Sequence, residues 1–532
     1  MILSKIVIKN YKLFRDFECE FNEGISILVG NNEVGKSTIL EAINLGLTGK
    51  LNGRNLHYEL TPYLCNDSAV KEYIDELSRG NNPIPPQILI ELYFQKDDEL
   101  ASLQGTNNSK KENVPGVFIS IEFNEEYADE YEEYIRNPEE IRTIPIEYYD
   151  VKWYSFGHNP ITFRSIPLNT TLIDTTVTKT FYGTDKYISK IINDALDVKE
   201  RADLALSFRK LKETFASEEA IGNINSKLLS KKGKISDKDL SVSVDISPRT
   251  NWESSLTSYL DDVPFQFIGK GEQNSIKMNL ALETKAKESH LVLVEEPENH
   301  LSFSNMNKLI KKISEKCKEK QLILTTHSTF ILNKLGLHNV ILLENNCNKM
   351  TLKDLSKDTQ NYFMKLPGYD TLRMLLSRKP ILVEGPSDEL IVQKAYLQHK
   401  GKLPIEDGVD IITVRGLSFK RFLEIAKILE KEVKVVTDND GSVEALERKY
   451  EDYMDTEFIK IFFDRDEEYP TLEPQFLKFN NLDNLNTVLD RSESTKEDLL
   501  DYMKKNKTEC ALKIFESELD INMPEYIKNA IK

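Results

Sequence analysis

The chain has 532 residues, too many for one compact core, and its 40% hydrophobic and 30% charged content excludes an intrinsically disordered protein. Its apolar runs are no longer than strands, its first residues lack the apolar core of a signal peptide, and its five cysteines form no CxxC pair, so we expect a cytoplasmic protein without a membrane span or a cysteine zinc site. Because 87 acidic residues oppose 70 basic ones, a net charge of −17, any binding of nucleic acid must use local basic patches or bound cations.

The first 50 residues predict two strands, a glycine-rich loop and a helix. Hydrophobic residues alternate over 6–8 and 17–21, form a short apolar run at 25–29, and recur at helical spacing over 37–47. The loop before the helix, Gly30-Asn-Asn-Glu-Val-Gly-Lys-Ser37, fits the phosphate-binding pattern GxxxxGK[ST]. A strand before this pattern and a helix after it are the context in which it binds a nucleotide, and they disfavour a glycine loop that arose by chance.

In such a loop, glycines allow backbone N–H groups to point at phosphates, and the N-terminus of the next helix adds the positive end of its dipole. We expect Lys36 to reach the β- and γ-phosphates of ATP and Ser37 to coordinate Mg²⁺. The residues expected to contact the nucleotide in this segment are Gly30, Asn31, Asn32, Gly35, Lys36, Ser37 and Thr38.

Residues 51–180 are irregular, with strands predicted at 87–94, 117–123 and 144–153 between polar loops. Over 185–230 the apolar residues recur at helical spacing instead, which predicts a helical insertion. This insertion is either an antiparallel dimerisation arm or a core helical pair. The residues that carry the spacing are Ile188, Ile191, Ile192, Leu196, Leu204, Leu206, Phe208 and Leu211.

Two further strands end in residues suited to ATP chemistry. The strand at 291–295 ends in Glu295 and Glu296, and we expect Glu295 to support Mg²⁺ and Glu296 to orient or deprotonate the attacking water. A helix at 305–318 leads to the strand at 321–325, after which His327 is placed to contact the γ-phosphate. Taken alone, His327 would more often be a structural histidine, but its place after the other motifs favours a function.

The segment 268–275, Ile-Gly-Lys-Gly-Glu-Gln-Asn-Ser, stands before a helix predicted at 276–283 and partly matches the signature of ABC-type ATPases, with Gly269 in place of its first serine. In ABC-type ATPases this segment completes the nucleotide site of a partner subunit. The resemblance, which is to the SMC-like branch of that superfamily, therefore implies a homodimer with ATP between Lys36 of one copy and Gly271 of the other.

A second α/β pattern opens near residue 375. Strands are predicted at 381–384, 409–414 and 433–437, with helices at 387–399 and 418–430 between them. We therefore divide the chain into the N-terminal part of an ATPase domain (1–180), the helical insertion (181–240), the C-terminal part of the ATPase domain (241–374) and a second α/β domain (375–532). The predicted fold class is α/β throughout.

Carboxylates follow two strands of this second domain. Glu384 ends the first strand, Asp388 returns one helical turn later, and Asp438 and Asp440 follow the third strand as a DxD pair. Together these oxygens form a site for divalent cations that prefer hard oxygen ligands, and the Toprim resemblance described next implies Mg²⁺ or Mn²⁺. Separately, Glu384 could be a helix cap and the aspartates a polar turn, but their joint order on an α/β pattern disfavours those alternatives.

This arrangement resembles the Toprim domain, whose sites cleave phosphodiesters with one or two divalent cations. Thr471-Leu-Glu473 resembles a further acidic step of that domain, and Lys507, in Lys504-Lys-Asn-Lys507, would neutralise charge on the reacting phosphate, unless it is a solvated lysine. An ABC-type ATPase followed by a Toprim domain resembles the OLD (overcoming lysogenization defect) family. The residues that the resemblance implies for catalysis and metal binding are Glu384, Asp388, Asp438, Asp440, Glu473 and Lys507, with Glu389 as an alternative to Asp388.

The resemblance to the OLD family implies a metal-dependent DNA nuclease that forms homodimers, with tetramers as a further assembly. Members act in antiphage defence, as the nuclease beside a UvrD-like helicase in Gabija systems or as a retron effector with a reverse transcriptase and its msDNA. Two other functions stay open: cleavage of RNA, and a nucleotide-gated scaffold whose activity belongs to a partner. A topoisomerase is disfavoured because the domains for strand passage and an identifiable nucleophilic tyrosine are missing from the sequence pattern.

Overall fold

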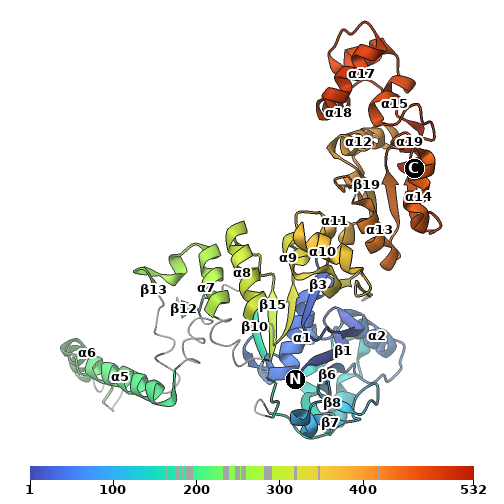
Figure 1. Cartoon of the computed structure of the whole chain (residues 1–532). Coiled ribbons are helices and arrows are strands. Elements are labelled where there is room, and N and C mark those ends of the chain that lie inside the picture. Colours follow the sequence, from blue (N-terminus) through green and yellow to red (C-terminus); the bar gives the residue numbers. More distant parts are fainter. Residues whose placement is uncertain are drawn as a thin grey trace.

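The computed structural model describes residues 1–532 except 163–164, 169, 175–179, 182–183, 186–195, 232–238, 246–251, 253–258, 281–289, 317–319, 345–347 and 417. Three larger sheets organise the described residues, two in the N-terminal part of the chain and one in the C-terminal part (Figure 1).

The first sheet is antiparallel, with the strand order β2-β1-β6-β8-β7 and with β9 paired to β8. Hydrophobic residues alternate along its strands, so that Ile6 and Ile8 of β1 enter the main core while Val7 packs on the other face. Its strands and the elements beside it are β1 (Leu3–Tyr11), β2 (Phe14–Glu20), β4 (Lys50–Leu51), β5 (Arg54–Asn55), α2 (Asp67–Ser78), β6 (Ile88–Phe94), β7 (Gln104–Gly105), β8 (Val114–Phe123), α3 (Ala128–Tyr134) and β9 (Tyr149–Ser155).

The second sheet has the order β10-β15-β16-β3-β17-β18, and all its neighbouring strands are parallel except β17 and β18. Parallel strands covered on both faces are apolar along their whole length, as β17 is. The helix α1 packs between the two sheets, because its buried Ile39 and Ile43 join a core to which both sheets contribute. The elements are β3 (Ile25–Gly30), α1 (Lys36–Thr48), β10 (Thr170–Asp174), α7 (Lys270–Leu280), β15 (Leu291–Glu295), α8 (Phe303–Lys316), β16 (Gln321–Thr325), α9 (Thr329–Leu335), β17 (Val340–Leu343) and β18 (Lys349–Thr351).

The third sheet is parallel, with the order β20-β19-β21-β22. Neighbouring residues of β19 point to opposite faces, so Leu382 packs with α13 while Ile381 packs with α12 and the C-terminal helices. Its elements are β19 (Lys379–Val383), α12 (Pro386–Lys400), β20 (Val409–Thr413), α13 (Phe419–Ile428), β21 (Val433–Val436), α14 (Val443–Met454), β22 (Ile459–Phe462), α15 (Leu472–Phe479), α16 (Leu482–Leu489), α17 (Lys496–Lys505), α18 (Lys507–Glu516) and α19 (Glu525–Ala530). The helices α10 (Lys357–Lys365) and α11 (Thr371–Leu376) join it to the second sheet (Figure 1).

The predicted insertion contains two helices, α5 (Val198–Ala216) and α6 (Glu219–Leu229), which lie side by side and away from the sheets (Figure 1). Neither helix has a buried residue, and Leu206, Leu211 and Phe215 are exposed, which disfavours a core helical pair. Ile188, Ile191 and Ile192 lie outside the described residues. No helix in the described ranges has both the length and the apolar character needed to cross a membrane.

Two predicted boundaries were wrong. The strand predicted from 144 begins at Tyr149, because Pro145 precedes a 3₁₀ turn over Ile146–Tyr148. The helix predicted from 276 begins at Lys270, so that Gly271 lies in its first turn instead of in a loop before it. A side chain at Gly271 would approach the carbonyl oxygen of His300 to 2.2 Å, so close packing explains the glycine.

Candidate nucleotide and metal sites

The phosphate-binding loop leads from the end of β3 into α1. Gly35 has φ of 94°, and a Cβ atom there would lie 2.4 Å from the ring of Phe14, so both the backbone and the space require glycine. Lys36 is buried, and its Nζ donates hydrogen bonds to the carbonyl oxygens of Gly30 and Asn31, both at 2.9 Å. The other predicted contacts are at least partly exposed, which leaves them accessible to a nucleotide: Asn31, Asn32, Ser37 and Thr38.

Acidic residues and a histidine lie beside this loop, because β15 and β16 end at the same sheet edge as β3. Glu295 closes β15, and Glu296 follows it with φ of 42°. The Nε2 atom of His327 lies 3.5 Å from Oε1 of Glu296. Burial lowers the pKa of His327, as does the charge of Lys36, which favours a neutral imidazole. The structure thus brings the loop, both glutamates and His327 together.

The sequence prediction gave Glu298 no role, yet it organises this edge. Its Oε1 accepts hydrogen bonds from Oγ1 of Thr326, at 2.9 Å, and from the backbone N–H of His327. Burial raises the pKa of Glu298. The sequence feature that could have predicted this role is the position of Glu298 in the acidic run Glu295-Glu-Pro-Glu298, at the end of β15. Gly271, by contrast, lies on α7, which packs against α8 and stands apart from α1 in Figure 1, so within one chain it is not part of the site.

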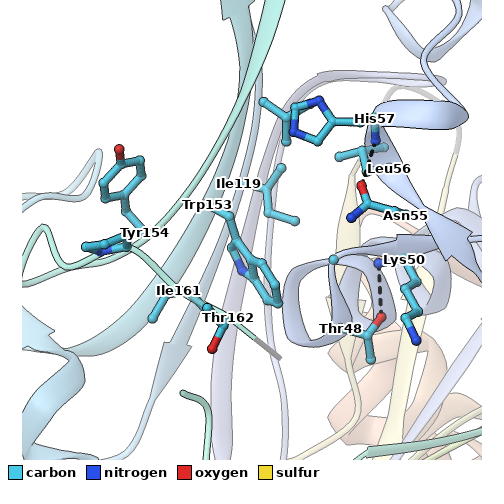
Figure 2. Close-up of a pocket in the computed structure, with 13 residues that line it drawn as sticks. Thr48, Lys50, Asn55, Leu56, His57, Ile119, Trp153, Tyr154, Ile161 and Thr162 are labelled. Atoms are coloured by element: carbon cyan, nitrogen blue, oxygen red, sulfur yellow. Dashed lines mark hydrogen bonds between the residues drawn. The ribbon is translucent and has the colours of Figure 1, made fainter. Parts of the chain in front are cut away.

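A cavity of about 470 Å³ lies at the other end of α1 (Figure 2). Trp153 forms one wall, and its indole N–H donates to the carbonyl oxygen of Gly46 at 3.0 Å. The dashed bonds in Figure 2 are local ones, from the backbone of Lys50 to Thr48 and from that of His57 to Asn55. No residue of the predicted nucleotide or metal sites lines this cavity.

The predicted metal site lies at the carboxyl edge of the third sheet. Glu384 follows β19, and Asp388 in the first turn of α12 accepts a hydrogen bond from the N–H of Gly385 at 2.9 Å. The neighbouring Glu389 turns to β20 instead, where it accepts a hydrogen bond from Thr413 at 2.9 Å. Of the two adjacent acids, Asp388 therefore has the position that fits a cluster with Glu384.

Electrostatics tie these acids to the DxD pair. Burial raises the pKa of Asp438 to about 8, and the charges of Asp388, Glu384, Glu473 and Asp440 add to that rise. Burial likewise raises the pKa of Asp388 to about 6. Groups that disfavour one another's ionisation in this way need a positive partner, and carboxylate oxygens are the ligands that Mg²⁺ and Mn²⁺ prefer.

The acids do not form a closed cage. Within the described part of the chain, no three acidic, histidine or cysteine side chains are close enough together to hold an ion as they stand. The chemistry of the donors, all of them carboxylate oxygens, nevertheless fits a divalent cation.

Glu473 and Lys507 complete the cluster. Glu473, in the first turn of α15, is buried and accepts a hydrogen bond from Oγ1 of Thr471 at 2.9 Å. Nζ of Lys507, at the start of α18, lies 3.1 Å from Oε1 of Glu473, while the lysine side chain is half exposed. Burial lowers the pKa of Lys507, but the charges of Glu473 and Asp438 outweigh that effect and raise it. A charged amine thus faces both solvent and the carboxylates.

Asn439, between the two aspartates of the DxD pair, was not predicted to have a role. Its buried amide donates to the carbonyl oxygens of Asp464 and Asp466, at 2.8 and 2.9 Å, and its Oδ1 accepts from the N–H of Gly441. The N–H of Asp440 donates to the carbonyl oxygen of Pro470, just before α15. These bonds fix the DxD pair to the loop that carries Glu473.

Replacing Asn439 with alanine is expected to weaken the binding of Mn²⁺ about 10- to 100-fold, the usual cost of losing a residue that orients ligands. Titration calorimetry on the full chain measures this. Asn480→Ala is the matched control, since Asn480 is also buried and also bridges two segments, but through Phe476 and Asn522. Equal losses of affinity in both variants would mean that Asn439 acts only on stability.

Two family models match the chain. Residues 1–259 match the AAA ATPase domain, and residues 375–440 match the Overcoming lysogenization defect protein-like TOPRIM domain. The chain is thus similar to OLD-family proteins in combining an ATPase domain with an OLD-like Toprim domain. This confirms the predicted ATPase–Toprim architecture, and domains of these two kinds generally use ATP and Mg²⁺. A protein with these two domains is nuclease-like in its domain composition.

Curated relatives match shorter stretches of this chain. Structural maintenance of chromosomes protein 6 of Saccharomyces cerevisiae is 26% identical over 115 residues, and RecF of Clostridium acetobutylicum, a DNA replication and repair protein, is 25% identical over 126. These matches take in 20% and 24% of this chain, and it spans only 10% and 33% of the lengths of those relatives.

Among solved structures, the C-terminal region of the Xanthomonas campestris OLD protein matches 29% of this chain and 92% of its own length, with 19% identity and a TM-score of 0.24. Because this TM-score is low, the fold assignment depends on the two family models and on the strand order of the sheets.

Proposed function

We propose that this chain is an ATP-binding, divalent-metal-dependent DNA endonuclease or nickase. The carboxylate cluster carries the proposal: burial, reinforced by the charges of the four other acids, raises the pKa of Asp438 to about 8. A protein that keeps such a costly arrangement has a use for the cation that relieves it. Glu384, Asp388, Asp438, Asp440 and Glu473 are the proposed ligands.

When bound, Mg²⁺ or Mn²⁺ would polarise the scissile phosphate and lower the pKa of an attacking water. The residues of the chain do the rest. Glu384, Asp388, Asp438 and Asp440 would provide the oxygens that hold the cation. Lys507 holds a positive charge at the solvent-facing side of Glu473, where a phosphate oxygen can approach it. Because the chain has a net charge of −17, binding of DNA depends on this local cationic chemistry.

At the ATPase site, we propose that Lys36 leaves the carbonyl oxygens of the loop to bind the β- and γ-phosphates, and that Ser37 and Glu295 bind the accompanying Mg²⁺. Glu296 would orient the attacking water, and the neutral His327 would hydrogen-bond to the γ-phosphate. Gly271 of a second copy would close the site, so the proposal includes a homodimer, with tetramers as a further assembly. The exposed helices α5 and α6 are the proposed dimerisation arm.

The test is cleavage of supercoiled plasmid by the full chain with Mg²⁺ or Mn²⁺, with and without ATP. The wild type is expected to convert the plasmid to nicked or linear forms, and EDTA or Asp438→Ala is expected to stop it. Asp407→Ala is the control, since Asp407 belongs to the same domain but pairs with Lys402. Cleavage of RNA but not plasmid would favour a ribonuclease. Inertness of the wild type with both cations would favour a scaffold that depends on a partner.

Antiphage defence is the proposed biological role, because the chain resembles the OLD family in its domain architecture. A UvrD-like helicase or a reverse transcriptase with its msDNA is the proposed accessory partner. Survival of phage infection by cells that carry the gene region, compared with cells that carry Asp438→Ala, tests this role.

A further inference from the structure

The ATPase and Toprim parts share one uninterrupted core. Val29 of β3, beside the nucleotide loop, and Leu382 of β19, beside Glu384, belong to the same cluster of buried apolar residues. The helices α10 and α11 lie between α9 and α13 within this cluster (Figure 1). Because this packed core, and not a solvated linker, joins the two sites, a movement at the nucleotide site is expected to affect the Toprim site.

Asn333 connects the nucleotide side to this joint. The helix α9 starts directly after His327, with Ser328 as its cap, and Asn333 lies about 9 Å further along at the usual rise of 1.5 Å per residue. Asn333 is fully buried, and its amide donates to the carbonyl oxygens of Pro367 and Tyr369, both at 3.1 Å. Its Oδ1 accepts a hydrogen bond from Thr371 at 2.7 Å. A shift of α9 must therefore move the segment 367–371.

Tyr369 carries the connection to the Toprim side. The hydroxyl of Tyr362 lies 2.6 Å from that of Tyr369 and 2.6 Å from Oγ of Ser418, and Ser418 donates to Tyr369 at 3.3 Å. A serine at the start of a helix usually caps it, but Ser418 makes no such bond in α13. The guanidinium of Arg415 also lies 5.5 Å from the ring of Tyr369. The buried hydroxyl of Ser418 is thus used between domains and not within its own helix.

The last step leads from Ser418 to Glu384. The N–H of Ser418 donates to the carbonyl oxygen of Gly416 at 2.8 Å, and the N–H of Gly416 donates to the carbonyl oxygen of Glu384 at 3.2 Å. Arg415 has a φ of 53°, a conformation that a residue with a side chain keeps only when its surroundings hold it, so the backbone before Gly416 is held by its contacts.

We propose that Asn333, Tyr369 and Ser418 are positioning residues that transmit the state of the nucleotide site to Glu384. When a γ-phosphate draws His327 and the start of α9, Asn333 shifts the segment 367–371, and Tyr369 and Ser418 pass that shift to the backbone of Glu384. The proposal rests on the nuclease function proposed above and adds to it how that site is regulated. The competing explanation is that these bonds only hold the two parts together.

The experiment compares the full-length wild type with Tyr369→Phe and Ser418→Ala, measuring the ratio of plasmid cleavage rates with and without ATP. Without ATP, both variants are expected to cleave the plasmid at close to the wild-type rate. Their ratio of rates with and without ATP is expected to lie about 2- to 30-fold closer to one than the wild-type ratio, which is the usual effect of a single residue on the coupling between two sites. The control is Tyr396→Phe, which loses a hydroxyl bond to Asp407 in the same domain. A wild-type ratio of one, or an unchanged ratio in both variants, would overturn the relay.

Hydrogen exchange separates this proposal from the nuclease function. With ATP added to the full chain, the amides of Val414 and Gly416, which donate to the carbonyl oxygens of Val383 and Glu384, are expected to change their exchange rates in the wild type but not in Ser418→Ala. If that change occurs in a wild type that cleaves no DNA, the relay stands and the nuclease fails. If the plasmid is cleaved and the exchange rates of these amides do not change with ATP, the nuclease function stands and the relay fails.

Discussion

Replacing Asp438 with asparagine is expected to slow plasmid cleavage roughly a thousandfold, the effect of losing about 4 kcal/mol of transition-state stabilisation. The same change is expected to stabilise the metal-free protein, and increasingly so as the pH rises. Burial, reinforced by Asp388 and Glu384, raises the pKa of Asp438 from 3.8 to about 8. A carboxyl with a raised pKa holds its proton more tightly in the folded chain than in the unfolded one.

The stabilisation from that proton is therefore complete below about pH 4 and is lost as the pH rises toward 8. Asparagine cannot lose a proton, so the variant avoids this loss of stability. In EDTA, the melting temperature of the variant minus that of the wild type should therefore increase between pH 5 and 8.5, by about 2–4 °C for each kcal/mol of stability. With saturating Mg²⁺, the wild type should instead melt at a higher temperature than the variant. Asp407→Asn is the control, because the bond to Lys402 lowers the pKa of Asp407. Asparagine at this position should therefore not stabilise the protein at high pH. A difference that stays flat with pH would exclude Asp438 as the titrating group.

The motifs could be placed from sequence because each follows a strand. In a parallel sheet, successive strand–helix units deliver their carboxyl ends to one edge, so Gly30, Glu295 and His327 had to meet, as did Glu384 and Asp438. Family models confirm the two-domain architecture that these motifs predicted. The roles of the individual site residues stay predictions, as do the three boundaries between the four predicted segments.

What the sequence could not provide depends on contacts between distant segments. Asn439 reads as a turn residue, and only the folded loop shows its amide bound to Asp464 and Asp466. Asn333 lies in an ordinary amphipathic helix, and its partners follow 34 and 36 residues later. The segment 268–275 was expected to precede a helix at 276–283, but α7 begins at Lys270 and includes Gly271, which packs against His300.

Replacing Lys507 with methionine is expected to lower the maximal rate of cleavage about 100- to 1000-fold with little change in KM for DNA, because its charge acts on the phosphate as negative charge develops. Methionine keeps most of the volume of the side chain and removes only the amine. Lys507→Arg should recover part of the rate, since it restores the charge with a different shape. Lys504→Met, three residues earlier and exposed at the end of α17, is the control and should lose little.

Binding of Mn²⁺ distinguishes this role of Lys507 from a structural one. Nζ of Lys507 lies 3.1 Å from Oε1 of Glu473, so the amine and a bound cation would compete for the same carboxylate. Lys507→Met should therefore bind Mn²⁺ at least as tightly as the wild type while cleaving DNA far more slowly. Weaker binding of Mn²⁺ together with slower cleavage would instead mean that the lysine holds Glu473 in place for the metal, and that the phosphate is neutralised by another group.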